Sequence, residues 1–365
     1  MHCRLTISCA LALIAYAAGC HAAPLTLARR STIALPTQAT DQFGQPFTIT
    51  GLSAITYLDP TRCGAAEPAP DSDHRFIAVM DNSSKLIELS IRFDASGVIT
   101  QCTLIRGLTL TTTHDWEGAA FTDPARNSII LSDEDRAALS EFRLTDGTLI
   151  RDIAPPSIYT QRRANLGLES LSSRERTDHY WLANEEALAI DGPISTPTSG
   201  TDVRLSLLNI APTPISAPLL IKQVVYRTEP IHGAVVNGAR SGLSGLVALP
   251  DGRLLALERS FGLASPLFLT RVYEVTTAAT DVRLQTAGLT PGTFSRCGKS
   301  LIYSGGNNNL EGLCLGPRLA GPASTRWALV GIVDDGDPIS INQVVSFQLD
   351  GLSTRRRELQ VAPAH

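Results

Sequence analysis

The sequence predicts an all-β protein folded as a β-propeller, with five blades that can be counted and room for a sixth. Three observations support this prediction. A five-residue phrase recurs five times along the chain, each copy is followed by short strand-like runs that end in acids, and Asp-Pro, Pro-Asp-Gly and Asp-Gly turns separate the runs. The 28 Gly and 22 Pro among 365 residues leave little room for long helices.

The repeated phrase consists of an apolar residue, then Ser or Glu, a small residue and a second apolar residue. Its copies occupy residues 51–55, 115–119, 167–171, 242–246 and 309–313. Each copy is expected to open the first strand of a blade, because an alternating or apolar run of strand length begins there. The run 31–35 precedes the first copy and is expected to pair with the last blade and close the ring.

The second run of each repeat ends in an acid, at Asp81, Asp133, Glu185, Glu258 and Asp334. Positions 81, 133 and 185 are 52 residues apart, whereas the steps to 258 and 334 are 73 and 76 residues. A four-stranded blade needs about 40–50 residues, so each step holds one blade and its loops. The longer steps carry Pro-rich insertions at 193–199 and 212–218, which leave a sixth blade possible.

Propeller geometry places the start of each first strand and the end of each second strand on one face. The Ser or Glu of the five phrases should therefore surround the mouth of the central channel, at Ser53, Glu117, Glu169, Ser244 and Glu311. Carboxylate oxygens without Cys or His suit a hard cation, Ca²⁺ or Mg²⁺, of which Ca²⁺ is the one expected here. The expected ligands are drawn from Glu117, Glu169, Glu311, Asp81, Asp133, Glu185, Glu258 and Asp334. The competing interpretation is that these acids cap turns and bind neighbouring blades.

Arginine and histidine residues near these acids could contact a substrate. Arg136, Arg163 and Arg259 stand where guanidinium forks could bind phosphate oxygens, although each could instead pair with a neighbouring acid. His114, three residues before Glu117, is the histidine closest to the expected mouth. Paired zinc-binding histidines and a complete G-x-S-x-G elbow are both missing from the sequence, so zinc and serine hydrolase chemistry are disfavoured.

The remaining features concern export and the class of protein. A hydrophobic share of 43% excludes a disordered chain, and a net charge of -4 argues against nucleic-acid binding. Residues 1–22 have the form of a signal peptide, so residues 23–365 are expected to form one exported domain, periplasmic or secreted. The stretch 17–20 resembles a lipobox, with a lipid anchor at Cys20 as the alternative. Later stretches are too short for a transmembrane span.

Four cysteines follow the signal segment, at Cys63, Cys102, Cys297 and Cys314. An even number in an exported chain suggests disulfides, and four cysteines allow three pairings. Proximity in the sequence favours Cys63–Cys102 and Cys297–Cys314.

Taken in order, the phrases resemble the bacterial family called "esterase-like activity of phytase". The resemblance runs from about residue 45 to residue 350 and includes the five phrases together with Ala183-Asn184-Glu185-Glu186, Leu257-Glu258-Arg259-Ser260 and Asp334-Asp335. Trp116 stands where this family often has Pro, and Gly336-Asp337 follows the last acid pair where Asn is common. The resemblance implies an exported propeller that hydrolyses phosphomonoesters or other esters.

The expected function is therefore Ca²⁺-dependent hydrolysis of a small ester or phosphoester, with Glu117, Glu169, Glu311 and His114 as the catalytic candidates. One alternative is a non-catalytic propeller that binds a ligand or protein on its acidic face. Another is a lactonase of the gluconolactonase or paraoxonase type, for which Asn184 and Asn309 would be metal ligands. The substrate and the oligomeric state stay open.

Overall fold

The structure is a computed structural model that describes residues 23–63, 68–174, 177–212, 217–306, 309–320, 324–337 and 339–352. The expected signal segment 1–22, with Cys20, lies outside the described residues. The described part of the chain holds no helix with the length and apolarity that a membrane crossing needs.

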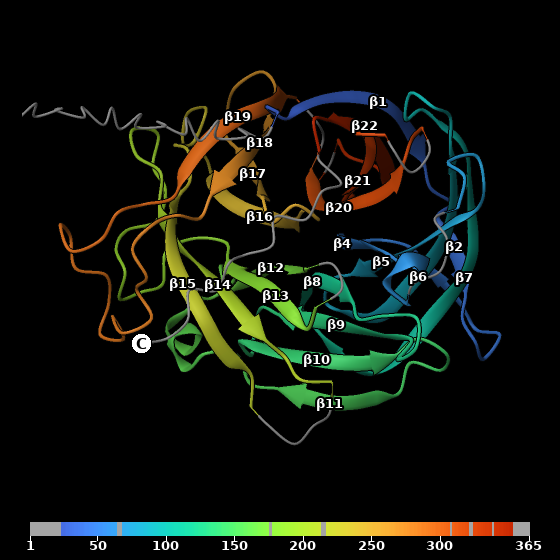
Figure 1. The fold of residues 1–365 in the computed structure, drawn as a ribbon, viewed down its shortest axis with the longest axis horizontal. Coiled ribbons are helices and arrows are strands. Elements are labelled where there is room, and N and C mark those ends of the chain that lie inside the picture. Colours follow the sequence, from blue (N-terminus) through green and yellow to red (C-terminus); the bar gives the residue numbers. More distant parts are fainter. Residues whose placement is uncertain are drawn as a thin grey trace, which may run out of the picture.

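Five four-stranded antiparallel sheets are arranged in a ring, which confirms the predicted all-β propeller and fixes the blade number at five (Figure 1). The strands of the first three blades, from the inner strand outward, are β4 (Leu52–Tyr57), β5 (His74–Met80), β6 (Ser83–Phe93) and β7 (Ile99–His114); β8 (Trp116–Phe121), β9 (Ser128–Asp133), β10 (Ala138–Arg143) and β11 (Leu149–Ile153); and β12 (Leu168–Ser173), β13 (His179–Asn184), β14 (Asp202–Asn209) and β15 (Leu219–Arg227). Those of the last two are β16 (Arg240–Ala248), β17 (Leu254–Phe261), β18 (Phe268–Thr276) and β19 (Gly298–Gly305); and β20 (Leu310–Arg318), β21 (Trp327–Val333), β22 (Gln343–Asp350) and β1 (Thr26–Ala34).

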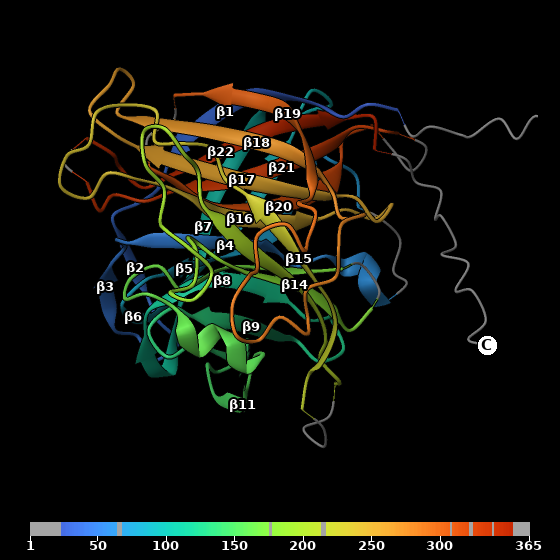
Figure 2. The same ribbon diagram turned by 90° about the vertical axis from the view of Figure 1, so that its left-hand side faces the viewer.

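The N-terminal strand completes the last blade, as the run before the first phrase predicted. β1 pairs antiparallel with β22, with Ile33 opposite Val344 and Leu27 opposite Leu349. The N-terminal strand thus forms the outer strand of a sheet whose other three strands come from the C-terminal part of the described chain. β1 lies beside β19 of the fourth blade in both views (Figures 1 and 2). This pairing joins the fifth blade to the start of the chain and closes the ring.

The additional sequence of the two long steps lies in loops, so the sixth blade left open above is not formed by the described residues. Long connections join β13 to β14, β15 to β16 and β18 to β19. Outside the five blades, β2 (Gln38–Thr40) and β3 (Pro46–Thr48) form a hairpin that contacts β7. Two short 3-10 helices, η1 (Pro60–Cys63) and η2 (Ser157–Gln161), complete the described elements.

The inner strands of neighbouring blades approach closely at the small residue of each phrase. A Cβ added at Gly118 would lie 2.8 Å from the backbone nitrogen of Leu171, in the next blade. A Cβ added at Gly312 would lie 2.9 Å from the backbone nitrogen of Ile55, which is the equivalent contact between the fifth blade and the first. The small residue in the phrase is therefore explained by blade packing at the centre of the ring.

The predicted disulfides are not formed in this structure. Cys102, Cys297 and Cys314 are free thiols, and the side chain of Cys63 lies outside the described residues. Cys297 packs with the third and fourth blades, whereas Cys314, on the inner strand β20, packs against the core shared by the first and fifth blades. Proximity in the sequence misled the prediction of Cys297–Cys314, because the chain passes from the outer edge of one blade to the centre of the next between these residues.

Candidate functional site

Every inner strand carries a β-bulge at the same position of the phrase. The pairing register skips Ser53, Glu117, Glu169, Ser244 and Glu311, so that each lies between two paired residues without a partner of its own. A bulge redirects the extra side chain and twists the strand locally. The Ser or Glu that the phrase repeats is therefore the bulged residue of its blade.

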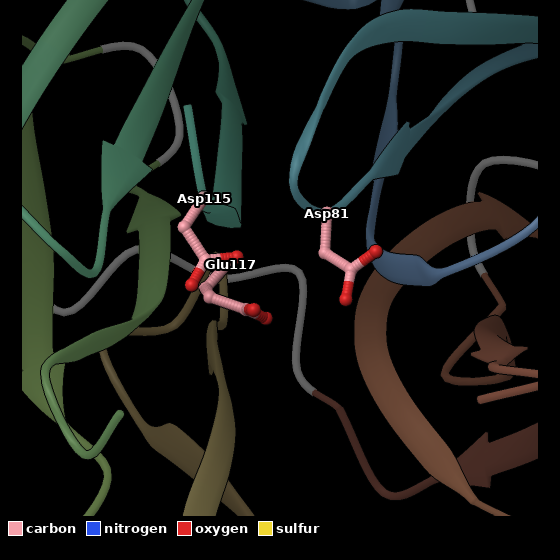
Figure 3. A group of neighbouring side chains, drawn as sticks. All are labelled: Asp81, Asp115 and Glu117. Atoms are coloured by element: carbon pink, nitrogen blue, oxygen red, sulfur yellow. The ribbon is translucent and has the colours of Figure 1, made fainter. Parts of the chain in front are cut away.

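Two overlapping groups of carboxylates lie at this end of the ring. Oxygen atoms of Asp81, Asp115 and Glu117 lie within 4.8 Å of one another, and so do oxygens of Glu117, Glu134 and Glu169. Figure 3 shows Asp115 and Glu117 extending from one side of the first group and Asp81 facing them from the turn between β5 and β6. We call these five residues the acidic half of the mouth.

Burial and mutual repulsion hold the carboxyls of the acidic half toward the protonated form. The pKa of Glu117 is raised well above its usual value, first by desolvation and then by the charges of Glu169 and Glu311. Desolvation also raises the pKa of Glu169, of Glu134 to about 7 and of Asp81 to about 6. Without a bound cation, the surroundings of these carboxyl groups therefore disfavour their ionised form.

The acidic half has few compensating donors. Glu134 accepts a hydrogen bond from the backbone N–H of Gly167 at 2.8 Å. The Oδ1 atom of Asp115 is buried and has no hydrogen-bond partner among the described residues. Within the same part of the chain, no Lys or Arg forms an ion pair with any of the five acids.

The other half of the mouth contains arginines, and we call it the arginine half. Arg259 donates to Oδ1 of Asn309 at 2.8 Å and to Oε1 of Glu185 at 3.1 Å, and it also pairs with Glu311. Arg240 pairs with Oε2 of Glu185 at 3.1 Å. Burial raises the pKa of Glu311 to about 7, and the charge of Arg259 opposes that shift. Arg259, Glu185 and Glu311 thus join three different blades.

Asp334 belongs to the same face. Its Oδ2 accepts a hydrogen bond from Asn309 at 3.0 Å, and its buried Oδ1 has no partner among the described residues. Desolvation raises its pKa. The next residue, Asp335, accepts the backbone N–H of Gly51 at 2.9 Å and so joins the fifth blade to the first.

Four other expected site residues have local partners instead. Asp133 is bound by Arg136, with His114 Nδ1 3.5 Å from its Oδ2, so these three form a cluster of their own. Glu258 accepts hydrogen bonds from Tyr226, Lys299 and the backbone of Glu229. Asp133, Arg136 and Glu258 therefore match the competing interpretation, in which acids and arginines bind their neighbours in the fold.

Arg163 is likewise engaged away from the acids. Its guanidinium donates to the backbone oxygens of Ala187 and Gly192, at 3.1 and 2.8 Å. These bonds tie the connection before β12 to the loop after β13 and leave Arg240 as the second arginine at the mouth.

Sequence reasoning missed Asp115, Glu134 and Arg240 as site residues. Asp115 opens the second phrase, where three of the other copies have Gly and one has Asn. Glu134 follows Asp133 directly, and the position at which a strand-like run ends does not show which of two consecutive acids faces the channel. Arg240 precedes the fourth phrase by two residues and has no counterpart in the repeat.

An apolar ring lies below the polar one. It consists of the last residue of each phrase, which is buried in all five blades: Ile55, Ala119, Leu171, Leu246 and Leu313. These side chains also line a cavity of about 170 Å³ whose other walls come from the far ends of the inner strands. The acids therefore lie at one end of the channel, beyond a ring of apolar side chains.

Comparisons with known proteins place the chain in a family. The family model described as "Esterase-like activity of phytase" matches residues 48–331, whereas no curated protein matches the chain. Among solved structures, a chain of Kuenenia stuttgartiensis hydrazine synthase is 10% identical with a TM-score of 0.33, over 76% of this chain and 60% of that one. A chain of Chaetomium thermophilum Polycomb Repressive Complex 2 is 8% identical with a TM-score of 0.41, over 83% and 70%. A luciferin-regenerating enzyme is 12% identical with a TM-score of 0.34, over 83% and 97%.

These structural likenesses are too distant to bear on function. The family model covers most of the chain and includes all five phrases, from the first inner strand to β21. The protein therefore belongs to the phytase-like family, whose description is "Esterase-like activity of phytase".

Proposed function

We propose that this protein is a metal-dependent hydrolase of ester or phosphoester bonds and that its active site is the mouth formed by the acidic and arginine halves. The observation that carries the proposal is the group of five buried or half-buried carboxylates with which no Lys or Arg of the described chain forms an ion pair. Such a group is costly to keep ionised without a cation.

The residues at the mouth fit a hard cation. Oxygens bound to one Ca²⁺ lie 2.3–2.6 Å from it, so they can be up to about 5 Å apart, and the oxygens of each acidic group meet this limit. The unpartnered Oδ1 of Asp115 provides a free ligand atom. Asp81, Asp115, Glu117, Glu134 and Glu169 would hold the ion, which when bound would supply Lewis-acid polarisation of a substrate oxygen.

The arginine half supplies the complementary chemistry. Arg259 and Arg240 can orient an anionic oxygen of a phosphoester or a carboxylate, because a guanidinium donates two parallel hydrogen bonds to such groups. Glu311, with a pKa near 7 beside Arg259, can take up and return a proton at neutral pH. The cavity beneath is lined by the apolar ring and by none of these acids or arginines.

The lactonase alternative is less well supported. Asn184 donates to the backbone oxygen of Glu186 and accepts from the backbone nitrogen of Arg204, at 3.2 Å. Asn309 is bound on both sides, by Arg259 and by Asp334. Neither amide is free to act as a metal ligand without giving up these partners.

Metal analysis of the purified full chain, combined with a panel of ester and phosphoester substrates with and without chelator, tests the proposal. We expect turnover that chelation abolishes and Ca²⁺ restores. Glu117→Gln, Glu169→Gln and Glu311→Gln should each lower activity, and their effects should be non-additive because they serve one site. Asp71→Asn, an exposed acid in the loop between β4 and β5, is the control. Wild-type activity in all three Glu variants would leave only the ligand-binding alternative.

A further inference from the structure

The acidic half contains two groups of ligand atoms that share one residue. Asp81 and Asp115 form one group with Glu117, and Glu134 and Glu169 form the other. The residues come from the first three blades, through the turn after β5, the start of β8, the turn after β9 and the bulge of β12. A carboxylate has two oxygen atoms, so a single Glu117 can contribute to both groups at once.

Several observations show that ligand atoms are available in both groups. Asp115 is 6% exposed, and its buried Oδ1 has no partner among the described residues. The carboxylates of Glu117 and Glu169 receive no hydrogen bond from the described chain. In this respect they differ from Glu185 and Glu311, which Arg259 already binds.

The backbone is shaped around the Asp81 carboxylate. Gly51 has a φ of +61°, and a Cβ at this position would lie 1.9 Å from Oδ1 of Asp81. Only glycine adopts this conformation and leaves this space without strain. The first phrase therefore begins with a residue that permits Asp81 to reach the mouth.

From this arrangement we infer that the mouth binds two divalent cations side by side, with Glu117 as the ligand common to both. Asp81 and Asp115 complete one position, and Glu134 and Glu169 complete the other. The inference rests on the metal dependence proposed above and adds the number of ions and the bridging residue.

Charge balance favours two ions over one. The five carboxylates carry five negative charges when ionised, and no guanidinium of the described chain pairs with them. One divalent ion would leave three of these charges uncompensated in a largely buried site, whereas two would leave one. Arg240 and Arg259 act on Glu134 and Glu169 through space, and they are suited to offset the remaining charge.

Counting bound Ca²⁺ in the metal-stripped full chain tests the inference, by calorimetric titration and by native mass spectrometry. We expect two ions in the wild type. Asp81→Asn should leave only the ion on the Glu134 side, and Glu134→Gln, which keeps an acceptor for the Gly167 N–H, should leave only the ion on the Asp81 side. Glu117→Gln should weaken both ions at least about tenfold. Asp71→Asn should bind as the wild type does.

Circular dichroism in chelator establishes that each variant is folded, and Asp115→Asn replaces Asp81→Asn if the latter fails this check. A single ion in the wild type, or loss of the same ion in Asp81→Asn and Glu134→Gln, would overturn the shared pair. A single ion together with chelator-sensitive hydrolysis would overturn it and leave the proposed function intact. Two ions without hydrolysis of any substrate would support the pair and contradict the proposed function.

Discussion

Lowering the pH should stabilise the metal-free protein, which is the opposite of ordinary acid denaturation. A carboxyl whose folded-state pKa lies above its unfolded value binds protons more readily in the folded state. Stability is then lowest above the folded-state pKa and rises as the pH falls through it toward the unfolded value. Burial gives Glu134, Glu186 and Glu311 pKa values of about 7, against an ordinary value of 4.5 for a Glu carboxyl. Between pH 8 and pH 6 these groups should therefore favour the folded state progressively.

The size of the effect follows from these pKa values. One carboxyl with values of about 7 folded and about 4.5 unfolded costs the folded state about 3 kcal/mol at pH 8 and about 2 kcal/mol at pH 6. Between pH 8 and pH 6, three such groups would together raise the free energy of unfolding by up to about 4 kcal/mol. The gain is smaller where protonation of one group relieves the repulsion on the next. For a domain of roughly 330 residues, 2–4 kcal/mol corresponds to a Tm increase of about 3–6 °C.

Thermal unfolding followed by circular dichroism in chelator, at pH 8, 7 and 6, measures this change. Glu134→Gln is the matched variant, because the amide oxygen still accepts the Gly167 N–H while the titrating group is removed. It should show a smaller Tm increase on acidification than the wild type, and Asp71→Asn should show the wild-type increase. Burial lowers the pKa values of His74 and His179, which opposes the trend equally in all three proteins. A Tm that falls from pH 8 to pH 6 by the same amount in the wild type and Glu134→Gln would refute the reasoning.

Three further predictions concern other parts of the molecule. Millimolar Ca²⁺ should raise the Tm more at pH 8 than at pH 6, because protons and cations compete for the same carboxylates; equal shifts would place the binding elsewhere. Arg259→Met should destabilise the protein by about 3–5 kcal/mol in chelator, since Glu185 and Glu311 lose a buried partner. Arg143→Met, which removes an exposed pair with Asp146, should destabilise it far less; similar losses of the two variants in thermal unfolding would contradict this. Alkylation under denaturing, non-reducing conditions should modify Cys102, Cys297 and Cys314, and mass spectrometry would detect any disulfide that protected them.

Much of the fold could be predicted from the sequence because each blade repeats one local pattern. The phrases locate the inner strands, and the run before the first phrase closes the ring as β1. The ring of Ser53, Glu117, Glu169, Ser244 and Glu311 follows from the same repeat. These features depend on residues that are close in the sequence or occupy equivalent positions.

Features set by contacts between blades could not be predicted in the same way. Whether Asp133 or Glu134 faces the channel depends on where β9 ends and on Gly167 of the next blade, which binds Glu134. Arg259 was a candidate because of the acid beside it, Glu258, yet it binds Glu185 and Glu311 from the two flanking blades. Glu258, which is adjacent to Arg259 in the sequence, pairs with Lys299 instead. An acid next to an arginine in a strand points to the other face of the sheet, so adjacency in the sequence says little about ion pairs.

The bulge at the phrase explains how a repeated fold can carry an asymmetric site. Because the bulged residue has no pairing partner on the next strand, Ser and Glu can exchange there without disturbing the ladder. Glu occupies the bulge in the second, third and fifth blades, and Ser in the first and fourth. The first blade adds Asp81 to the acids of its neighbours, whereas the fourth adds Arg240 and Arg259. The charge at the mouth is thus divided between the acidic half and the arginine half by side chains, over inner strands that carry the same bulge in all five blades.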